Sequence, residues 1–195
     1  SYADWLGRRY RDGITRAIQP GGNMALTTFQ GPVKSLKGFY AAGPGTVISL
    51  TADTTLTVAA HAGKIMVTND ADGKFTLPTI DATADNAIAG PGPDPSNTNN
   101  VGATYTFIVE TAATDMDIKT DGTDKFVGGL YTGVDDATGK TFISAAANDV
   151  ITMNGTTKGG LVGSVVVATA MANDKYHITG FSLGSGTLVT PFANA

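Results

Sequence analysis

The sequence predicts an all-β protein: a single antiparallel β-sandwich or barrel, jelly-roll-like or tulip-like, with an N-terminal arm. Three observations support this prediction. Short runs of alternating apolar and polar residues recur along the chain, separated by Gly, Asn, Asp or Thr, as strands and tight turns require. Glycine accounts for 25 of the 195 residues. Only 15% of the residues are charged, against about 25% in typical soluble domains, so long surface helices are disfavoured.

Residues 61–80 show this pattern most clearly and predict a β-hairpin. Alternation over 64–68 and again over 74–77 indicates two strands with one apolar face each. The sequence Asn-Asp-Ala-Asp-Gly at 69–73 tolerates the positive φ angles of a tight turn. Pro78 ends the second strand because it has no N–H to donate.

About eight to ten short strands are expected in one domain, residues 24–195. The Gly128-Gly129 pair predicts a bulge or a close approach of two backbones. Three successive valines, 165–167, predict a strand buried on both faces, and Asn154-Gly155 predicts a second hairpin turn. Besides the hairpin at 61–80, the expected strands are 47–50, 54–58, 104–110, 125–131, 141–144, 149–153, 163–169 and 175–181, and residues 187–190 finish the domain.

Residues 1–23 differ from the rest of the chain and are predicted to be an arm. Four arginines against two aspartates give this segment a charge of +2, which leaves −6 for the remainder of a chain with net charge −4. Met24 resembles a translation start, so 1–23 is either a native arm or an added extension. The alternatives to a partner-gripping arm are a segment folded against its own domain and a loosely ordered terminus. The candidate partner-binding residues, of types enriched at interfaces, are Trp5, Arg8, Arg9, Tyr10, Arg11 and Arg16.

Residues 81–103 form the one long loop that the sequence predicts. Their Pro, Gly and Asn content disfavours both a helix and a central strand. A loop of this length in a compact domain is either functional or mobile, so we expect it to face solvent and to be the most mobile part of the domain.

Several function classes lack their usual signals. The chain has no cysteine, which excludes disulfides, zinc thiolate sites and cysteine nucleophiles. No apolar run approaches the ~20 residues of a membrane span, and a net charge of −4 does not favour nucleic-acid binding. No catalytic residues and no cofactor are predicted, so an enzyme is not expected.

Metal binding has weak support in the sequence. An acidic cluster follows the expected strand at 104–110, but its spacing does not match an EF-hand loop. Solvated turn aspartates or a loose surface calcium site would both account for it, and the two histidines are too few for a His-rich site. The cluster consists of Asp115, Asp117, Asp121 and Asp124.

One resemblance runs through most of the predicted domain. Its phrases, in order, are Leu50-Thr-Ala-Asp, Ala62-Gly-Lys-Ile through Phe75-Thr-Leu-Pro78, Tyr105-Thr-Phe-Ile-Val109, Asn154 through Gly163, and Lys175 through Gly180. In this order they resemble small virion proteins of tailed phages, in particular capsid decoration (cement) proteins. The resemblance covers roughly residues 46–192, and the arm and the long loop depart from it.

The resemblance implies a structural protein on the capsid exterior of a phage virion. Its partner would be the major capsid protein, it would be a homotrimer, and it would stabilise contacts between capsid subunits without nucleic acid or membrane. Alternatives are a head-fibre or tail-associated virion protein, or a carbohydrate- or host-surface-binding β module. A glycan site would usually show clustered exposed aromatic residues, yet the single tryptophan, Trp5, lies outside the domain.

Overall fold

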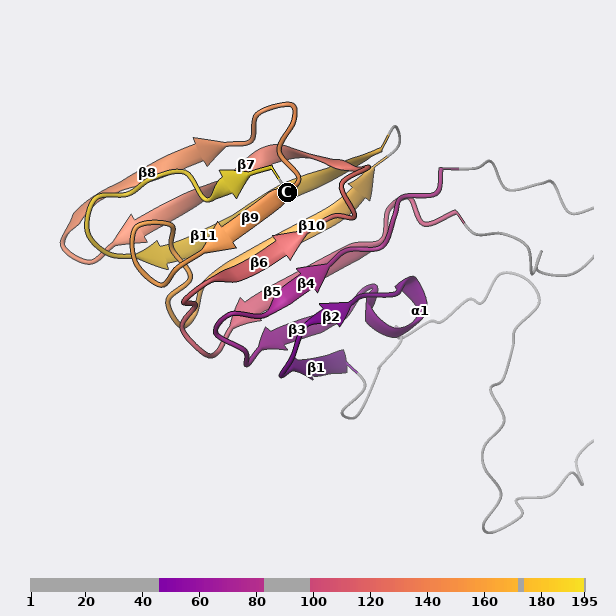
Figure 1. Cartoon of the computed structure of the whole chain (residues 1–195), viewed down its shortest axis with the longest axis horizontal. Helices are drawn as coiled ribbons and strands as arrows, with labels where there is room; N and C mark the ends of the chain where they lie inside the picture. The colour runs from indigo at the N-terminus through magenta and orange to yellow at the C-terminus, as the bar shows by residue number, and fades with distance from the viewer. Residues whose placement is uncertain (1–45, 83–98, 172–173, 195) are drawn as a thin grey trace, which may run out of the picture. The chain divides into compact units, whose positions relative to one another are not determined.

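The computed structural model describes residues 46–82, 99–171 and 174–194 (Figure 1). The arm 1–23, with its six candidate binding residues, and most of the loop 81–103 lie outside the described residues. The described residues form twelve strands and one helix of a single turn. The all-β prediction is confirmed, although there are more strands than the expected eight to ten.

The strands form two open sheets (Figure 1). The seven-stranded sheet contains, in spatial order, β1 (Val47–Leu50), β3 (Ile65–Thr68), β5 (Thr104–Val109), β10 (Val165–Met171), β11 (Lys175–Gly184), β7 (Lys125–Val134) and β8 (Ala137–Ile143). The five-stranded sheet contains β12 (Phe192–Ala193), β9 (Val150–Met153), β6 (Met116–Lys119), β4 (Lys74–Thr76) and β2 (Thr54–Thr55). Neither sheet closes into a barrel.

Both sheets are mixed, so the antiparallel prediction is wrong. Of the ten strand pairs, five are parallel: β1 with β3, β3 with β5, β2 with β4, β4 with β6, and β7 with β11. Four of these pairs, all except β7 with β11, arise because the chain between β1 and β6 passes to the other sheet after every strand. A strand therefore pairs with the strand two places along the chain, which runs in the same direction.

We call each of the three units β1–β2, β3–β4 and β5–β6 a coil. Successive coils stack, and the turns between the two sheets stack with them. The N–H of Asn69 in the second coil donates to the carbonyl oxygen of Leu50 in the first, at 2.8 Å, and the N–H of Glu110 in the third donates to Thr68 in the second, at 3.1 Å. The turns are thus hydrogen-bonded to the neighbouring coil.

The predicted hairpin at 61–80 is wrong for the same reason. β3 and β4 exist, but they belong to different sheets and do not pair, and 69–73 connects the sheets. The Asn154-Gly155 turn likewise joins no hairpin, since β9 and β10 lie in different sheets. Alternation with a period of two identifies the face to which a side chain points, but not the strand that pairs with it.

One strand boundary also differs from the prediction. The expected strand at 54–58 ends after β2, because Thr57 caps the short helix α1 (Val58–His61), its side chain accepting from the N–H of Ala60 at 3.3 Å. Residues 187–190 form no strand, and the last strand is β12.

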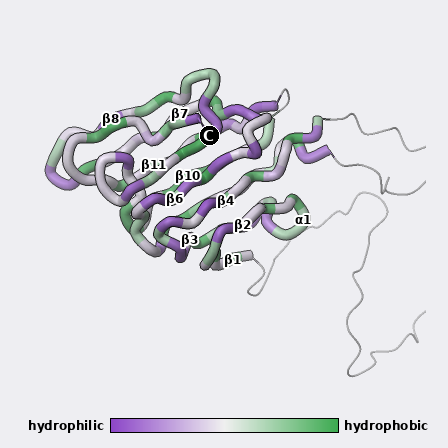
Figure 2. Tube along the Cα trace, viewed as in Figure 1, coloured by the Kyte–Doolittle hydropathy of each residue, from purple (hydrophilic) through white to green (hydrophobic). Residues whose placement is uncertain are grey.

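One hydrophobic cluster takes side chains from both sheets. The rings of Phe75 in β4 and Phe107 in β5 stack with centroids 6.3 Å apart, and Tyr105 and Ile118 are also fully buried. Figure 2 shows hydrophilic and hydrophobic residues alternating along the strands. The predicted alternation over 104–110 is confirmed, because Tyr105, Phe107 and Val109 are buried and the residues between them are half-buried.

The Gly128-Gly129 pair brings three strands close together. A Cβ on Gly128, whose φ is +109°, would lie 2.2 Å from the carbonyl oxygen of Ile178 in β11, and one on Gly129 would lie 2.5 Å from that of Phe142 in β8. The predicted close approach is confirmed. No bulge occurs here, because β7 and β11 keep one register from Lys125 to Val134, and the only shift against β8 lies between Thr132 and Val134.

Gly128→Ala should destabilise the protein more than Gly102→Ala. Both glycines have positive φ, 109° and 89°, but a Cβ on Gly102 would meet no atom within 4 Å. Gly102→Ala should therefore cost about 1–2 kcal/mol from backbone strain alone. Gly128→Ala should cost about 2 kcal/mol more, because ladder hydrogen bonds to β11 are also lost. Urea unfolding of both variants measures the difference, and equal costs would contradict the close approach.

Candidate binding surface

Two neighbouring rows on the outer face of the seven-stranded sheet carry uncharged side chains across all seven strands, whereas Lys125 and Lys175 lie further along the same face, near the ends of β7 and β11. Register partners place the outward side chains in rows that run across the sheet. We call two of these rows together the uncharged face. One row contains Ser49, Val67, Ile108, Val165, Phe181, Tyr131 and Thr141. The other contains Val47, Ile65, Thr106, Val167 and Thr179, and it ends in β8 with Ile143, the register partner of Gly129. None of these side chains is charged at neutral pH.

The described part of the chain leaves this face open to solvent. Tyr131 and Phe181 are 45% and 43% exposed, and their rings stack with centroids 5.7 Å apart. Ile143 is 77% exposed. At the centre of the sheet, Val165 and Val167 are only half-buried. The prediction that the valine strand is buried on both faces is therefore wrong for its outer face.

The outer face of the five-stranded sheet is different, because it carries charges that pair. The Nζ of Lys74 lies 3.0 Å from Oδ2 of Asp115 and 3.1 Å from Oδ2 of Asp117. Partial burial lowers the pKa of Lys74, but the hydrogen bonds to these carboxylates raise it by more, so the net shift is upward. Ion pairs of this exposure contribute about 0–1 kcal/mol. The two rows of the uncharged face have no such charges.

A buried polar cluster lies at the base of the long loop. The carboxylate of Asp124 is fully buried and accepts the N–H of Ile80 at 2.8 Å through Oδ2, while its Oδ1 has no partner among the described residues. The hydroxyl of Tyr176 donates to the carbonyl oxygen of Pro78 at 2.5 Å. Burial raises the pKa of Asp124, and it raises the pKa of Tyr105, whose hydroxyl is also unpaired, to about 12.

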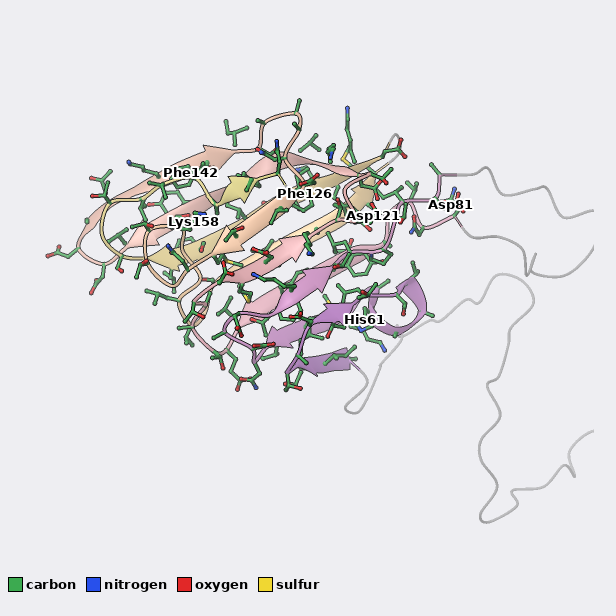
Figure 3. The ribbon with its side chains drawn as sticks, viewed as in Figure 1. His61, Asp81, Asp121, Phe126, Phe142 and Lys158 are labelled. Carbon is green, nitrogen blue, oxygen red and sulfur yellow. The ribbon has the colours of Figure 1, made fainter. Side chains whose placement is uncertain are left out.

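This end of the molecule also holds the two ends of the loop 81–103 together. The N–H of Asp81 donates to Oδ1 of Asn100 at 2.8 Å, and the N–H of Asn100 donates to the carbonyl oxygen of Asp81 at 3.0 Å. The side-chain amide of Asn100 also donates to the carbonyl oxygen of Thr79, at 2.8 Å. Figure 3 shows Asp81 and Asp121 at this end of the sheets. The exposure and mobility of the loop itself stay predictions.

The four aspartates that the sequence suggested as an acidic cluster do not form one cluster in the structure but fall into two pairs. Asp115 and Asp117 pair with Lys74, Asp124 is buried, and Asp121 accepts a hydrogen bond from the hydroxyl of Thr79 at 2.5 Å. Within residues 46–82, 99–171 and 174–194, no three His, Asp or Glu side chains are placed to hold a metal ion. No helix in the described ranges has the length and apolar character that crossing a bilayer requires.

Comparisons with protein families, curated proteins and solved structures gave no match. The resemblance to phage decoration proteins therefore stays a prediction from the ordered sequence phrases. The candidate residues of the arm, Trp5 to Arg16, lie outside the described residues, so the structure does not test them. The uncharged face was missed as a site, although its signal was present in outward positions occupied by Ile108, Val165 and Val167.

Asp124→Asn should change the pH dependence of stability. The folded protein raises the pKa of Asp124, chiefly through burial and also through the like charges of Asp121 and Asp174. The contribution of this residue to stability is therefore complete below its unfolded pKa of about 3.8 and is lost as the pH rises through the higher folded pKa. An asparagine keeps an acceptor for Ile80 and does not ionise, so the variant should gain stability relative to the wild type as the pH rises.

Denaturant unfolding between about pH 3 and pH 8 measures this effect. Tyr105 and Tyr176 stay protonated over this range, because burial raises the pKa of both hydroxyls. Asp135→Asn, at an exposed position, is the matched control. A difference between Asp124→Asn and wild type that stayed constant with pH would show that the Asp124 carboxyl does not titrate differently in the folded and unfolded states.

Proposed function

We propose that the chain is a structural protein of a tailed-phage virion, a decoration or cement protein that binds the outer surface of the capsid. It would attach through the uncharged face to the major capsid protein and stabilise contacts between capsid subunits. The uncharged face is the observation that supports attachment through the sheet, and the ordered sequence phrases support the phage context. We further propose that the two sheets are the layers of one β-sandwich, which the stacking of Phe75 on Phe107 supports.

The size of the uncharged face favours weak binding by each copy. Six strand spacings of about 4.8 Å span about 29 Å, and rows about 7 Å apart give a patch on the order of 400 Å². Patches of this size on single chains are often functional. At about 25 cal/mol per Å² of apolar area, its burial contributes at most about 10 kcal/mol, because four of its residues are Ser or Thr, while association itself costs about 4–15 kcal/mol. One face alone would therefore bind a partner weakly at best.

A weak contact becomes effective when several are linked. A homotrimer, as the resemblance implies, would bind the lattice with avidity. Because such a protein binds only the assembled lattice, it stabilises the lattice by mass action. In this proposal the arm supplies a further contact, with Trp5 and Tyr10 as anchors and Arg8, Arg9, Arg11 and Arg16 around them. Its charge of +2 would attract it to an acidic lattice that repels the rest of the chain.

A carbohydrate-binding module is the second candidate, and the stacked pair of Tyr131 and Phe181 favours it. Exposed aromatic rings are suitable platforms for sugar rings. The neighbouring positions, however, hold Val165, Thr141 and Gly133, which offer few hydrogen-bonding groups to the many hydroxyls of a sugar. The balance of apolar over polar groups supports a protein partner.

Phe181→Lys should weaken capsid binding at least ten-fold without changing the melting temperature. The side chain is half exposed, so the fold tolerates a lysine, but a bound partner would have to desolvate its charge. Thr152→Lys, on the outer face of the five-stranded sheet, is the matched control and should bind like wild type. Co-sedimentation with capsids built from the major capsid protein of the same genome measures both affinities. Equal binding by both variants would exclude the uncharged face as the attachment surface.

A variant that starts at Met24 tests the arm separately. We expect a nearly unchanged melting temperature and greatly weakened binding to the same capsids. Binding of the full chain should also weaken as salt is added, since charges beyond about 8 Å are screened at physiological ionic strength. Binding by the truncated chain at full strength would place attachment in the β domain alone, and unfolding of the truncated chain would show that the arm belongs to the core.

A further inference from the structure

The first coil leaves both sheets open at the same end. β1 is the last strand of the seven-stranded sheet and β2 is the last strand of the five-stranded sheet. The two strands are consecutive in the chain, and each pairs on one side only, with β3 and β4 respectively. We call this pair of strands the open end. Its outer edge presents backbone N–H and C=O groups that have no ladder partner among the described residues.

The interior between the sheets is also incompletely covered at the open end. Ile48 is the register partner of Met66, which in turn partners Phe107. Met66 and Phe107 are fully buried, whereas Ile48 is only half-buried. In the other sheet, Thr54 occupies the position next to the fully buried Phe75 and is half-buried too. At these two positions the core ends in side chains that remain partly open to water, although Leu50 and Leu56 beside them are buried.

The open end lacks the charges that commonly protect sheet edges. Native edge strands often carry lysine, proline or a bulge that prevents pairing with another strand. Residues 46–61 contain no lysine, arginine or proline, and Asp53 and His61 are their only ionisable side chains. Both are engaged locally: Oδ1 of Asp53 accepts the N–H of Lys74 at 2.8 Å, and Nδ1 of His61 accepts that of Thr57 at 3.0 Å.

We propose that the open end pairs with the open end of a second copy of this chain. A two-fold axis perpendicular to the sheets would place β1 antiparallel to its counterpart and β2 antiparallel to its counterpart, so that both sheets continue across the contact. Ile48 and its symmetry mate would then close the core. A single peptide strand could cover one edge only. The first coil of a second copy, by contrast, has both layers at the required spacing.

Charge also favours the open end as the place where copies meet. The described residues contain 13 acidic residues and seven lysines, a net charge of −6, so two copies repel one another over most of their surface. At the open end the one carboxylate, Asp53, is hydrogen-bonded to its own chain. This contact does not depend on the capsid role proposed above, and a two-fold pair would take the place of the homotrimer in that proposal. It uses the outer edges of β1 and β2, although Val47 and Ser49 of β1 also belong to the uncharged face.

Single cysteines provide the test, because the chain contains none of its own. Ser49→Cys in β1 and Thr55→Cys in β2 each introduce one thiol at an exposed position of the open end. In the proposed dimer, facing or diagonal positions lie within about 8 Å of their counterparts, so a short bis-maleimide should link each variant into a dimer. Thr141→Cys and Thr152→Cys are the controls, on β8 and on the outer face of β9, and should stay monomeric. The full chain is used throughout.

A second pair of variants measures the contact without cross-linking. Ser49→Lys with Thr55→Lys should lower the dimer affinity at least ten-fold in sedimentation velocity, with little change in melting temperature, whereas Thr141→Lys with Thr152→Lys should not. Linking of both open-end cysteines, with this loss of affinity, supports the proposal. Linking at Ser49→Cys and Thr141→Cys but not at Thr55→Cys would overturn it in favour of contact through the uncharged face. If the protein is a monomer and none of the cysteine variants is cross-linked, the proposal is overturned in favour of an open end that another part of the same chain covers.

Discussion

The parallel stacking of coils is the constraint on which this structure depends. Because the chain changes sheet after each of the first strands, its backbone hydrogen bonds must come from the neighbouring coil. The N–H of Asn69 reaches Leu50, that of Glu110 reaches Thr68, and that of Leu77 reaches Lys119 at 2.7 Å. The same crossing carries the inward side chains of both sheets into one hydrophobic cluster. In β1 to β6, strand direction and the side of the core therefore both follow from this connection pattern.

The sequence was sufficient to predict the strands and their faces but not their partners. The alternation around Phe107 correctly placed that side chain inside, because a period of two depends only on local geometry. The pairing of β3 depends on β1 and β5, which lie up to forty or so residues away, and no local pattern specifies it. The turn residues 69–73 suit a hairpin and a connection between sheets equally well, so they could not decide between the two.

The uncharged face could not be predicted from the sequence for a similar reason. Three valines in succession indicate burial on both faces of a strand, but they do not say what buries the outer face. In the structure Val166 points into the core, while Val165 and Val167 point outward and remain half-buried. A strand face covered by another protein and one covered by the same chain require the same apolar residue types, so the sequence does not distinguish them. In the sequence, the arginines and Trp5 of the arm are more conspicuous as binding residues, because they combine charge with aromatic content.

The uncharged face is favoured as a binding surface over the outer face of the five-stranded sheet. Docking through the outer face of the five-stranded sheet would require desolvating Lys74 and its two aspartates, and the existing pairing would offset little of that cost. Docking through the uncharged face desolvates no charged group in the two rows that define it, so the binding free energy is limited mainly by the buried area. The same reasoning applies at the open end, where neither β1 nor β2 contains a charged residue. The positions of charges thus favour these two surfaces over the remainder of the described molecule.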